Sequence, residues 1–388
     1  NLLIRQGTMQ PIYDGENIST VANLPNPNLK WEQTAQTNIG WDLGFFDGRL
    51  NIGGDFYYKK TTDLFTNVDV SPINGITSYI MNNGDMLNKG FSISLNGYPV
   101  KTKNFRWYMS TYYSVNLNKV QTDDARNYNL NDYLNGTAVV SGQPISTFYS
   151  YKFLGLNPQN GAPMFDDWED RWHLLQGKTL DEVVPMILVN SGTRDPKFSG
   201  DLNNTFTYKN WSLSLNFSYS LGSKVRLFEM YGPIINGISA AANVREEFLD
   251  RWQVPGDEKY TVYPSIISPS SPDYEHYRLH YSAPQRAVGP NSGVPAFANN
   301  VWQMYDDSDL RVVSGNYLKL QSLSFSYRLN DRLLRKTPFT QLSISFNTHN
   351  CFTISAKELR GQDPSQAGFA DAGLSIRPSY TIGLNVSF

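Results

Sequence analysis

The sequence contains very little cysteine and no long apolar run. The single cysteine, Cys351, excludes an internal disulfide framework and a cysteine-rich zinc site, and we expect a buried thiol. No stretch supplies the roughly 20 consecutive apolar residues of a transmembrane helix. Charged residues make up 18% of the chain, against about 25% in soluble domains. The net charge of −2 gives no basic face for nucleic acid, so we expect no nucleic-acid partner.

Aromatic residues, in contrast, are abundant. They form 14% of the chain, with 24 Tyr, 21 Phe and 8 Trp, although the mean hydropathy is polar at −0.42. Few charges, many aromatics and a polar average are typical of a transmembrane β-barrel, because lipid-facing and lumen-facing residues alternate and cancel in the mean. The chain begins at Asn1 without methionine or a leader segment, so we expect a fragment or a processed piece of a longer polypeptide.

Strict period-two alternation predicts β-strands. In WSLSLNFSYS, which starts at Trp211, apolar residues occupy one face and Ser or Asn the other. A bulge is expected near Gln321, because Leu318 and Leu320 fall on the opposite parity from the residues that follow. Nine spans show the alternation: Ile39–Phe45, Leu50–Tyr58, Phe91–Leu95, Trp107–Leu117, Leu202–Tyr208, Trp211–Tyr219, Leu323–Leu329, Leu342–Phe346 and Tyr380–Phe388.

Charges within or directly beside these spans fall on the polar parity alone. They include Asp42, Asp55, Arg106, Asp201 and Arg328. A lysine or arginine that faced lipid at the midplane would cost about 2–4 kcal/mol, so a barrel must keep one face free of charge. A soluble β-sandwich also has one apolar face, so this observation alone leaves both architectures open.

The connections between the spans separate the two architectures. They alternate strictly between short, at 46–49, 98–104, 209–210 and 330–337, and long, at 61–78, 118–197, 227–311 and 351–373. Outer-membrane barrels have short periplasmic turns and long extracellular loops, whereas a sandwich has no reason to sort its loops in this way. We therefore expect an all-β, antiparallel transmembrane barrel with four long extracellular loops. Within 118–197 we expect a small hairpin that turns at Asn157–Gly161, above the membrane.

Nine strands do not complete such a barrel. Bacterial single-chain barrels have even strand numbers, and unpaired strand edges cannot be solvated by hydrocarbon. The residues on the polar parity are mostly small, and a wide barrel holds water or a plug in its interior. We expect further strands and a plug in a part of the polypeptide that precedes this sequence.

Several segments in order resemble SusC-like TonB-dependent outer-membrane transporters, the RagA/SusC family. They include LPNPNLKWEQTAQTNIGWDLGFFDGRL from Leu24, NGDMLNKGFSISLNG from Asn83, YKFLGLNPQNGAPMFDD from Tyr151, DPKFSGDLNNTFTYKNWSLSLNFSYSLGSKV from Asp195, SGNYLKLQSLSFSYRL from Ser314 and the closing RPSYTIGLNVSF. The likeness covers nearly the whole chain, with gaps in the long loops.

The resemblance implies a barrel of about 22 strands with a plugged lumen, of which these are the last nine. It implies TonB-dependent active import of an oligomeric nutrient, glycan or peptide, across the outer membrane. The implied partners are a SusD-like surface lipoprotein, TonB through the missing N-terminal part, outer-membrane lipids, and the barrel-assembly machinery, which would read Phe388. A passive porin-like channel and a structural or secretion-associated barrel are the alternatives.

Candidate contact residues are aromatic side chains of the long loops, where no membrane faces them. These are Trp168, Trp172, Trp252, Tyr274, Tyr277 and Trp302. Flat rings suit substrate or lipoprotein contact, and they suit packing between loops equally well. Aromatic residues near the short turns indicate an interfacial girdle, namely Phe45, Trp107, Tyr208 and Trp211.

Enzyme chemistry is not indicated, because no nucleophile–base pair, phosphate loop or carboxylate dyad stands out. We expect no cofactor. A structural Ca²⁺ at Asp166–Asp170 or Tyr305–Asp309 is an alternative to solvated charge. His276 and His280 have helical spacing, but their loop context argues against a metal site.

Overall fold

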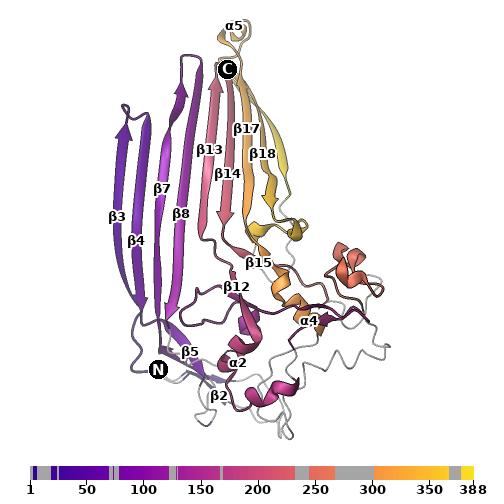
Figure 1. The fold of residues 1–388 in the computed structure, drawn as a ribbon. Helices are drawn as coiled ribbons and strands as arrows, with labels where there is room; N and C mark the ends of the chain where they lie inside the picture. Colours follow the sequence, from indigo (N-terminus) through magenta and orange to yellow (C-terminus); the bar gives the residue numbers. More distant parts are fainter. Residues whose placement is uncertain are drawn as a thin grey trace.

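The computed structural model describes residues 3–6, 19–23, 26–69, 73, 78–121, 128, 130–166, 169–231, 244–266, 301–366 and 377–388. Within these residues one sheet dominates (Figure 1). Its strands are β3 (Gln33–Phe45), β4 (Leu50–Thr62), β7 (Asp85–Lys101), β8 (Phe105–Gln121), β13 (Phe198–Tyr208), β14 (Trp211–Leu221), β17 (Tyr317–Arg328), β18 (Gln341–Ser355) and β19 (Ser379–Ser387). Their order is β19-β18-β17-β14-β13-β8-β7-β4-β3, and each pair is antiparallel. The nine strands therefore lie in the sheet in the same order as they occur along the chain.

Each of the nine alternating spans of the sequence corresponds to one of these strands, although Leu329 and Phe388 lie one residue beyond the ends of β17 and β19. The bulge near Gln321 is also confirmed. Leu320 pairs with Phe217 and Ser322 with Asn216, so Gln321 is the extra residue of β17. The bulge brings the apolar residues on both sides of it to one face of the sheet.

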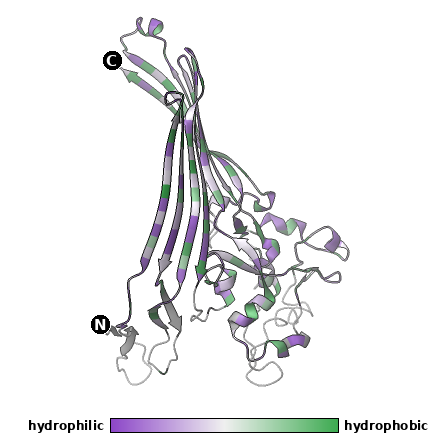
Figure 2. Ribbon diagram, turned by 60° about the vertical axis from the view of Figure 1, so that its left-hand side comes forward, coloured by the Kyte–Doolittle hydropathy of each residue, from purple (hydrophilic) through white to green (hydrophobic). Residues whose placement is uncertain are grey.

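The two faces of the sheet differ in polarity. Ile39, Phe56, Phe91 and Val115 are successive cross-strand neighbours in one row across β3, β4, β7 and β8. Such rows build an outward face on which many large apolar side chains remain uncovered by protein; Ile344 in the interior strand β18, for example, is 50% exposed. Figure 2 shows apolar and polar residues in alternate bands along the strands. An uncovered apolar face of this extent matches a hydrocarbon surrounding.

The connections between the nine strands alternate between short and long, as the sequence predicts. The short ones, 46–49, 102–104, 209–210 and 329–340, lie at one end of the sheet, at the top of Figure 1. The long ones, 63–84, 122–197, 222–316 and 356–378, start from the other end. Short turns at one end and long loops at the other are the arrangement of an up-and-down barrel wall.

Short elements occupy the connections. α5 (Asp331–Leu334) lies in the last short one, and β5 (Phe65–Asp69) pairs with β6 (Ser78–Asn82) in the first long one. The expected hairpin around Asn157–Gly161 is formed by β10 (Gly155–Leu156) and β11 (Pro163–Met164). Near the start of the chain, β1 (Leu3–Gln6) pairs with β2 (Ser19–Asn23). Among the described residues, no helix is both long and apolar enough to cross a membrane.

The second and third long connections fold together into what we call the loop layer, the described residues 128–193, 222–266 and 301–316. Besides β10 and β11, its elements are α1 (Leu130–Leu134), β9 (Thr147–Tyr151), η2 (Glu169–Leu174), α2 (Leu180–Ile187), β12 (Leu188–Thr193), β15 (Lys224–Arg226), η4 (Glu246–Asp250), η5 (Asp257–Lys259), α4 (Val301–Asp306), η6 (Asp309–Arg311) and β16 (Val312–Ser314). β9 pairs with β12, and β15 with β16. Leu175, Val183, Met230 and Tyr305 belong to one buried apolar cluster, so the layer has a core of its own.

Candidate functional site: the polar face and the loop layer

The polar face of the sheet carries small hydrogen-bonding side chains in cross-strand contact. Ser110 Oγ donates to Asn96 Oδ1 at 2.6 Å, and Ser324 Oγ donates to Asn347 Oδ1 at 2.6 Å. The five strand charges that the sequence assigns to this parity lie on it: Asp42, Asp55, Arg106, Asp201 and Arg328. Such a surface is compatible with water and offers donors and acceptors to a polar solute.

Three polar side chains on the outward parity find their hydrogen-bond partners within the sheet. The Trp107 indole Nε1 donates to Asn204 Oδ1 at 3.0 Å. Thr111 Oγ1 donates to the backbone oxygen of Asp201 at 2.8 Å, and the Tyr219 hydroxyl donates to that of Tyr112 at 3.2 Å. Because hydrocarbon supplies no hydrogen bonds, these pairings make the face suitable for lipid.

A buried ion pair fixes part of the last long connection to the polar face. Lys319, which pairs with Ser218 on that face of β14, places Nζ 3.1 Å from Asp363 Oδ2. The two side chains are only 4% and 9% exposed. Burial raises the pKa of Asp363, but hydrogen bonds from Ser365 and Lys319 outweigh it, so the pKa lies below its usual value. This ion pair was not predicted from the sequence, in which its only signal is a lysine on the polar parity of β17.

The segment that contains Asp363 also contacts the loop layer. It comprises η7 (Lys357–Leu359) and η8 (Pro364–Gln366). Leu359 is buried against Val225 and Leu227. Arg360 Nη2 lies 3.0 Å from Asp250 Oδ2. Residues 356–366, which we call the bridging segment, therefore link the sheet to the loop layer.

Buried charges organise the centre of the loop layer. The Asp306 carboxylate accepts hydrogen bonds from the backbone nitrogens of Met230 and Tyr231, both at 2.8 Å. Arg226 Nη2 donates to the backbone oxygen of Tyr149 at 2.8 Å, and Arg226 Nη1 lies 3.8 Å from Asp307 Oδ1. These contacts join residues of the two long connections.

Burial perturbs the ionisable groups of this centre. It raises the pKa of Asp307 to about 6, although Arg226 acts in the opposite direction. It lowers the pKa of Arg226 and raises that of Tyr305. In each case the charged form is disfavoured because water has been removed. The carboxylates and guanidinium groups serve the packing of the loop layer.

Two of the six aromatic candidates have described side chains. Trp252 is 8% exposed and lies over Gly161, and its Nε1 donates to Glu258 Oε2 at 3.4 Å. Trp302 is 4% exposed, and its Nε1 donates to the backbone oxygen of Ser265 at 3.4 Å. Both indoles take part in packing, one of the two roles left open, and substrate or lipoprotein contact stays a prediction. Trp172 lies in η2, but its side chain, together with Trp168, Tyr274 and Tyr277, lies outside the described residues.

The two acidic runs that were candidates for Ca²⁺ binding, Asp166–Asp170 and Tyr305–Asp309, make contacts within the protein. Asp166 Oδ1 lies 2.6 Å from Arg171 Nη2. Asp309 Oδ1 accepts a hydrogen bond from the backbone nitrogen of Phe153 at 3.0 Å. In the part of the chain that the structure describes, no three His, Cys, Asp or Glu side chains gather as metal ligands would. A structural Ca²⁺ stays a prediction, and His276 and His280 lie outside the described residues.

Aromatic residues mark the short-turn end of the outward face. The Trp211 ring contacts Phe325 and Tyr327 of the neighbouring strand, with ring centroids 5.3 and 4.2 Å away. Phe388 is 85% exposed and contacts Phe339, with centroids 5.3 Å apart. Phe45, Trp107 and Tyr208 lie at the same end. The arrangement is that of an interfacial girdle.

Comparison with known proteins adds three findings. Residues 5–245 match the family described as TonB dependent receptor-like, beta-barrel. The chain is 25% identical to TonB-dependent receptor P3 of Formosa agariphila over 397 residues, which cover 95% of this chain and 35% of that protein. It is 30% identical to TonB-dependent receptor SusC of Bacteroides thetaiotaomicron over 224 residues, 54% of this chain and 21% of that protein.

A solved structure shows the same fold. The RagAB peptide transporter superposes with a TM-score of 0.71 at 20% identity, and the match covers all of this chain and 38% of that one. The chain thus spans well under half the length of the proteins that it matches.

Proposed function

Since the chain belongs to the TonB dependent receptor-like β-barrel family, we propose that its sheet is part of the wall of an active nutrient importer in the outer membrane. The observation that carries the proposal is the two-sided sheet with all long connections at one end. The apolar face is turned to lipid and the polar face to the transport path. The loop layer lies at the extracellular mouth, where it restricts entry.

The cargo that we propose is an oligomeric nutrient, a glycan or a peptide. A polar face with serine, asparagine and threonine hydrogen-bonding groups suits either, because both present regularly spaced donors and acceptors. SusC and the RagAB peptide transporter, to which the chain is similar, support import as the activity. Energy would come from TonB, through a part of the protein outside this sequence.

The loop layer also supports a surface lipoprotein as partner. Leu249, Val254 and Tyr260, all from residues 246–260, leave large apolar side chains exposed on it. Exposed apolar groups close together on a loop are typical of an interface with another protein. We propose that a SusD-like lipoprotein covers this surface.

Uptake of labelled oligosaccharide and oligopeptide mixtures by cells that express the full-length protein tests the import proposal. We expect uptake that disappears when TonB is deleted. Uptake that persists without TonB would favour the passive channel, and folded protein without any uptake would favour a structural or secretion-associated barrel.

Co-purification tests the partner. Leu249→Ser combined with Tyr260→Ser should lower recovery of the lipoprotein with the barrel while the barrel remains folded. Leu333→Ser, an exposed leucine at the short-turn end, is the matched control. Equal recovery of the lipoprotein with the wild type, the double variant and the control would count against this surface as the docking site.

A further inference from the structure

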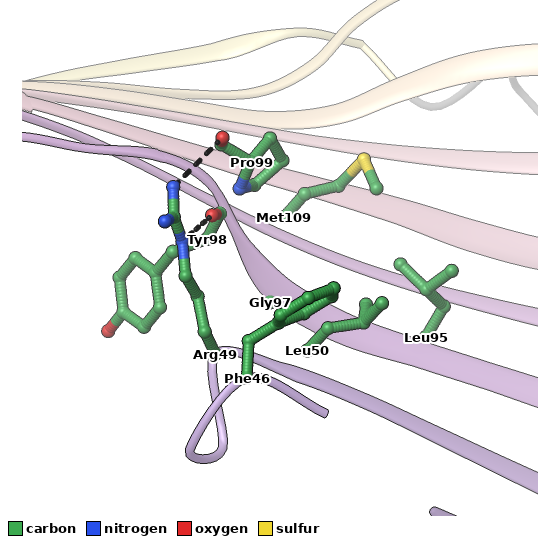
Figure 3. A pocket seen from close by; sticks show the side chains of 8 residues that line it. All are labelled: Phe46, Arg49, Leu50, Leu95, Gly97, Tyr98, Pro99 and Met109. Carbon is green, nitrogen blue, oxygen red and sulfur yellow. Dashed lines mark hydrogen bonds between the residues drawn. The ribbon is translucent and has the colours of Figure 1, made fainter. Parts of the chain in front are cut away.

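A pocket of about 330 Å³ opens on the outward face close to the short turns (Figure 3). It lies across β4, β7 and β8, several strands' width from β19 and next to the turn that joins β3 to β4. Apolar groups and a single cation line it, namely Phe46, Arg49, Leu50, Leu95, Gly97, Tyr98, Pro99 and Met109.

Gly97 creates the pocket. It pairs with Leu50 on one side and Met109 on the other, so a side chain is missing from the middle of an outward row. A comparable gap at Gly54 is filled by the Trp41 ring, which a Cβ at Gly54 would meet at 2.4 Å. At Gly97 a Cβ would instead meet the backbone oxygen of Arg49 at 2.7 Å. The gap therefore cannot easily be closed by a larger residue, and it remains open toward the outside.

Arg49 places a fixed positive charge beside this apolar space. Its Nε donates to the backbone oxygen of Tyr98 at 3.1 Å, and its Nη2 donates to that of Pro99 at 3.4 Å, as the dashed lines of Figure 3 show. Within the described residues it forms no ion pair, not even with Asp47 of the same turn.

We propose that this pocket binds one anionic glycerophospholipid of the membrane leaflet at the short-turn end. An acyl chain occupies the space between Phe46 and Met109, and the phosphate lies at Arg49. We choose a phospholipid as the ligand because of where the pocket lies. A pocket on a lipid-facing surface is filled by hydrocarbon, and the rim of that surface is where lipid phosphates lie. A guanidinium held by two carbonyl oxygens keeps further N–H groups for a phosphate.

Lipid titration of the full-length, detergent-purified protein by native mass spectrometry tests the proposal. The probes are dioleoyl-phosphatidylglycerol and, as the zwitterionic comparison, dioleoyl-phosphatidylcholine. We expect one phosphatidylglycerol to be retained about fivefold or more tightly than phosphatidylcholine, in keeping with a charge-assisted hydrogen bond. This comparison needs no variant.

Variants then locate the site. Arg49→Gln should remove the preference for the anionic lipid, whereas Lys336→Gln, an exposed lysine in another turn at the same end, should keep it. Met109→Trp, which fills the pocket, should weaken both lipids. Heat resistance of each variant on gels shows whether the barrel has assembled.

Equal retention of the two lipids by the wild type would overturn the proposal, and so would an unchanged preference in Arg49→Gln. Displacement of phosphatidylglycerol by lipopolysaccharide at equal concentration would also count against it, because it would show a different occupant. None of these results bears on import, which is measured separately.

Discussion

The indole of Trp107 hydrogen-bonds Asn204 across the boundary between β8 and β13, with Nε1 and Oδ1 3.0 Å apart. Asn204 is an amide on the outward, apolar parity, directly opposite Met109. The Trp107 ring also stacks on Phe206. One side chain thus supplies apolar surface to the membrane and satisfies a polar group that lipid cannot.

We expect Trp107→Phe to destabilise the barrel by about 1–3 kcal/mol, because it leaves the Asn204 carbonyl without its donor in an apolar surrounding. Urea unfolding of the full-length protein in lipid vesicles measures the change. The double variant Trp107→Phe with Asn204→Leu should recover most of the loss.

Trp211→Phe is the control. Trp211 also stacks on aromatic neighbours, but its indole nitrogen has no hydrogen-bond partner within the described residues. If both single variants lose the same stability, the hydrogen bond contributes nothing beyond ring packing.

Adjacent positions of β14 should respond oppositely to arginine. Leu215→Arg places a charge on the lipid-facing side at a cost of about 2–4 kcal/mol near the midplane and should impair assembly, as should Leu384→Arg in β19. Ser214→Arg, on the polar face beside Thr205, should assemble and alter uptake. Surface levels of heat-resistant protein are the readout, and equal levels in all three would refute the assignment of the faces.

The loop layer should open less readily at pH 5 than at pH 7. Burial raises the pKa of Asp307 to about 6 in the folded protein, above its usual value of 3.8. The folded state therefore binds the proton more tightly, so this contribution to stability is complete below the unfolded pKa and is lost as the pH rises through about 6. Hydrogen-exchange protection factors of β9, corrected for intrinsic rates, measure it.

Asp307→Asn should flatten that pH dependence, because the amide does not titrate. Asp331→Asn, an exposed residue of α5, should leave it intact. A pH dependence that survives in Asp307→Asn belongs to another group.

Loss of the buried ion pair should release the bridging segment. Lys319→Met leaves Asp363 buried without its cation, at a cost of about 3–5 kcal/mol for a fully buried pair. Trypsin cleavage after Arg360 should become faster. Adding Asp363→Leu should restore resistance, and Lys60→Met, which breaks the exposed pair with Asp85, should have little effect. Unchanged cleavage in Lys319→Met would show that the segment is held by Leu359 instead.

Phe388 is expected to serve assembly. Its deletion should lower the amount of heat-resistant barrel, while each assembled molecule transports normally. Phe46→Ala, which alters another highly exposed phenylalanine at the same end, is the control. Normal barrel levels with lost uptake would place the terminus in the transport mechanism.

The wall could be predicted from the sequence because its determinants are local. Alternation within each strand specifies the two faces, and even the bulge at Gln321 is visible as a change of parity between Leu320 and Leu323. The loop layer could not be predicted in this way. Asp306 binds the backbone of Met230, 76 positions away, and no periodic pattern records such a contact. For the same reason the sequence left Trp252 and Trp302 open between packing and contact.

The position of the bridging segment along the chain imposes an order on folding. Leu359 and Asp363 come from the connection between β18 and β19, yet they complete contacts of Leu227 and Lys319, which precede them. The loop layer therefore cannot complete these contacts until the connection between β18 and β19 has formed and has turned back over the polar face. Completion of the loop layer thus depends on residues that follow it in the sequence, so a chain in which β18 and β19 had not paired would also lack the contacts that hold the loop layer to the sheet.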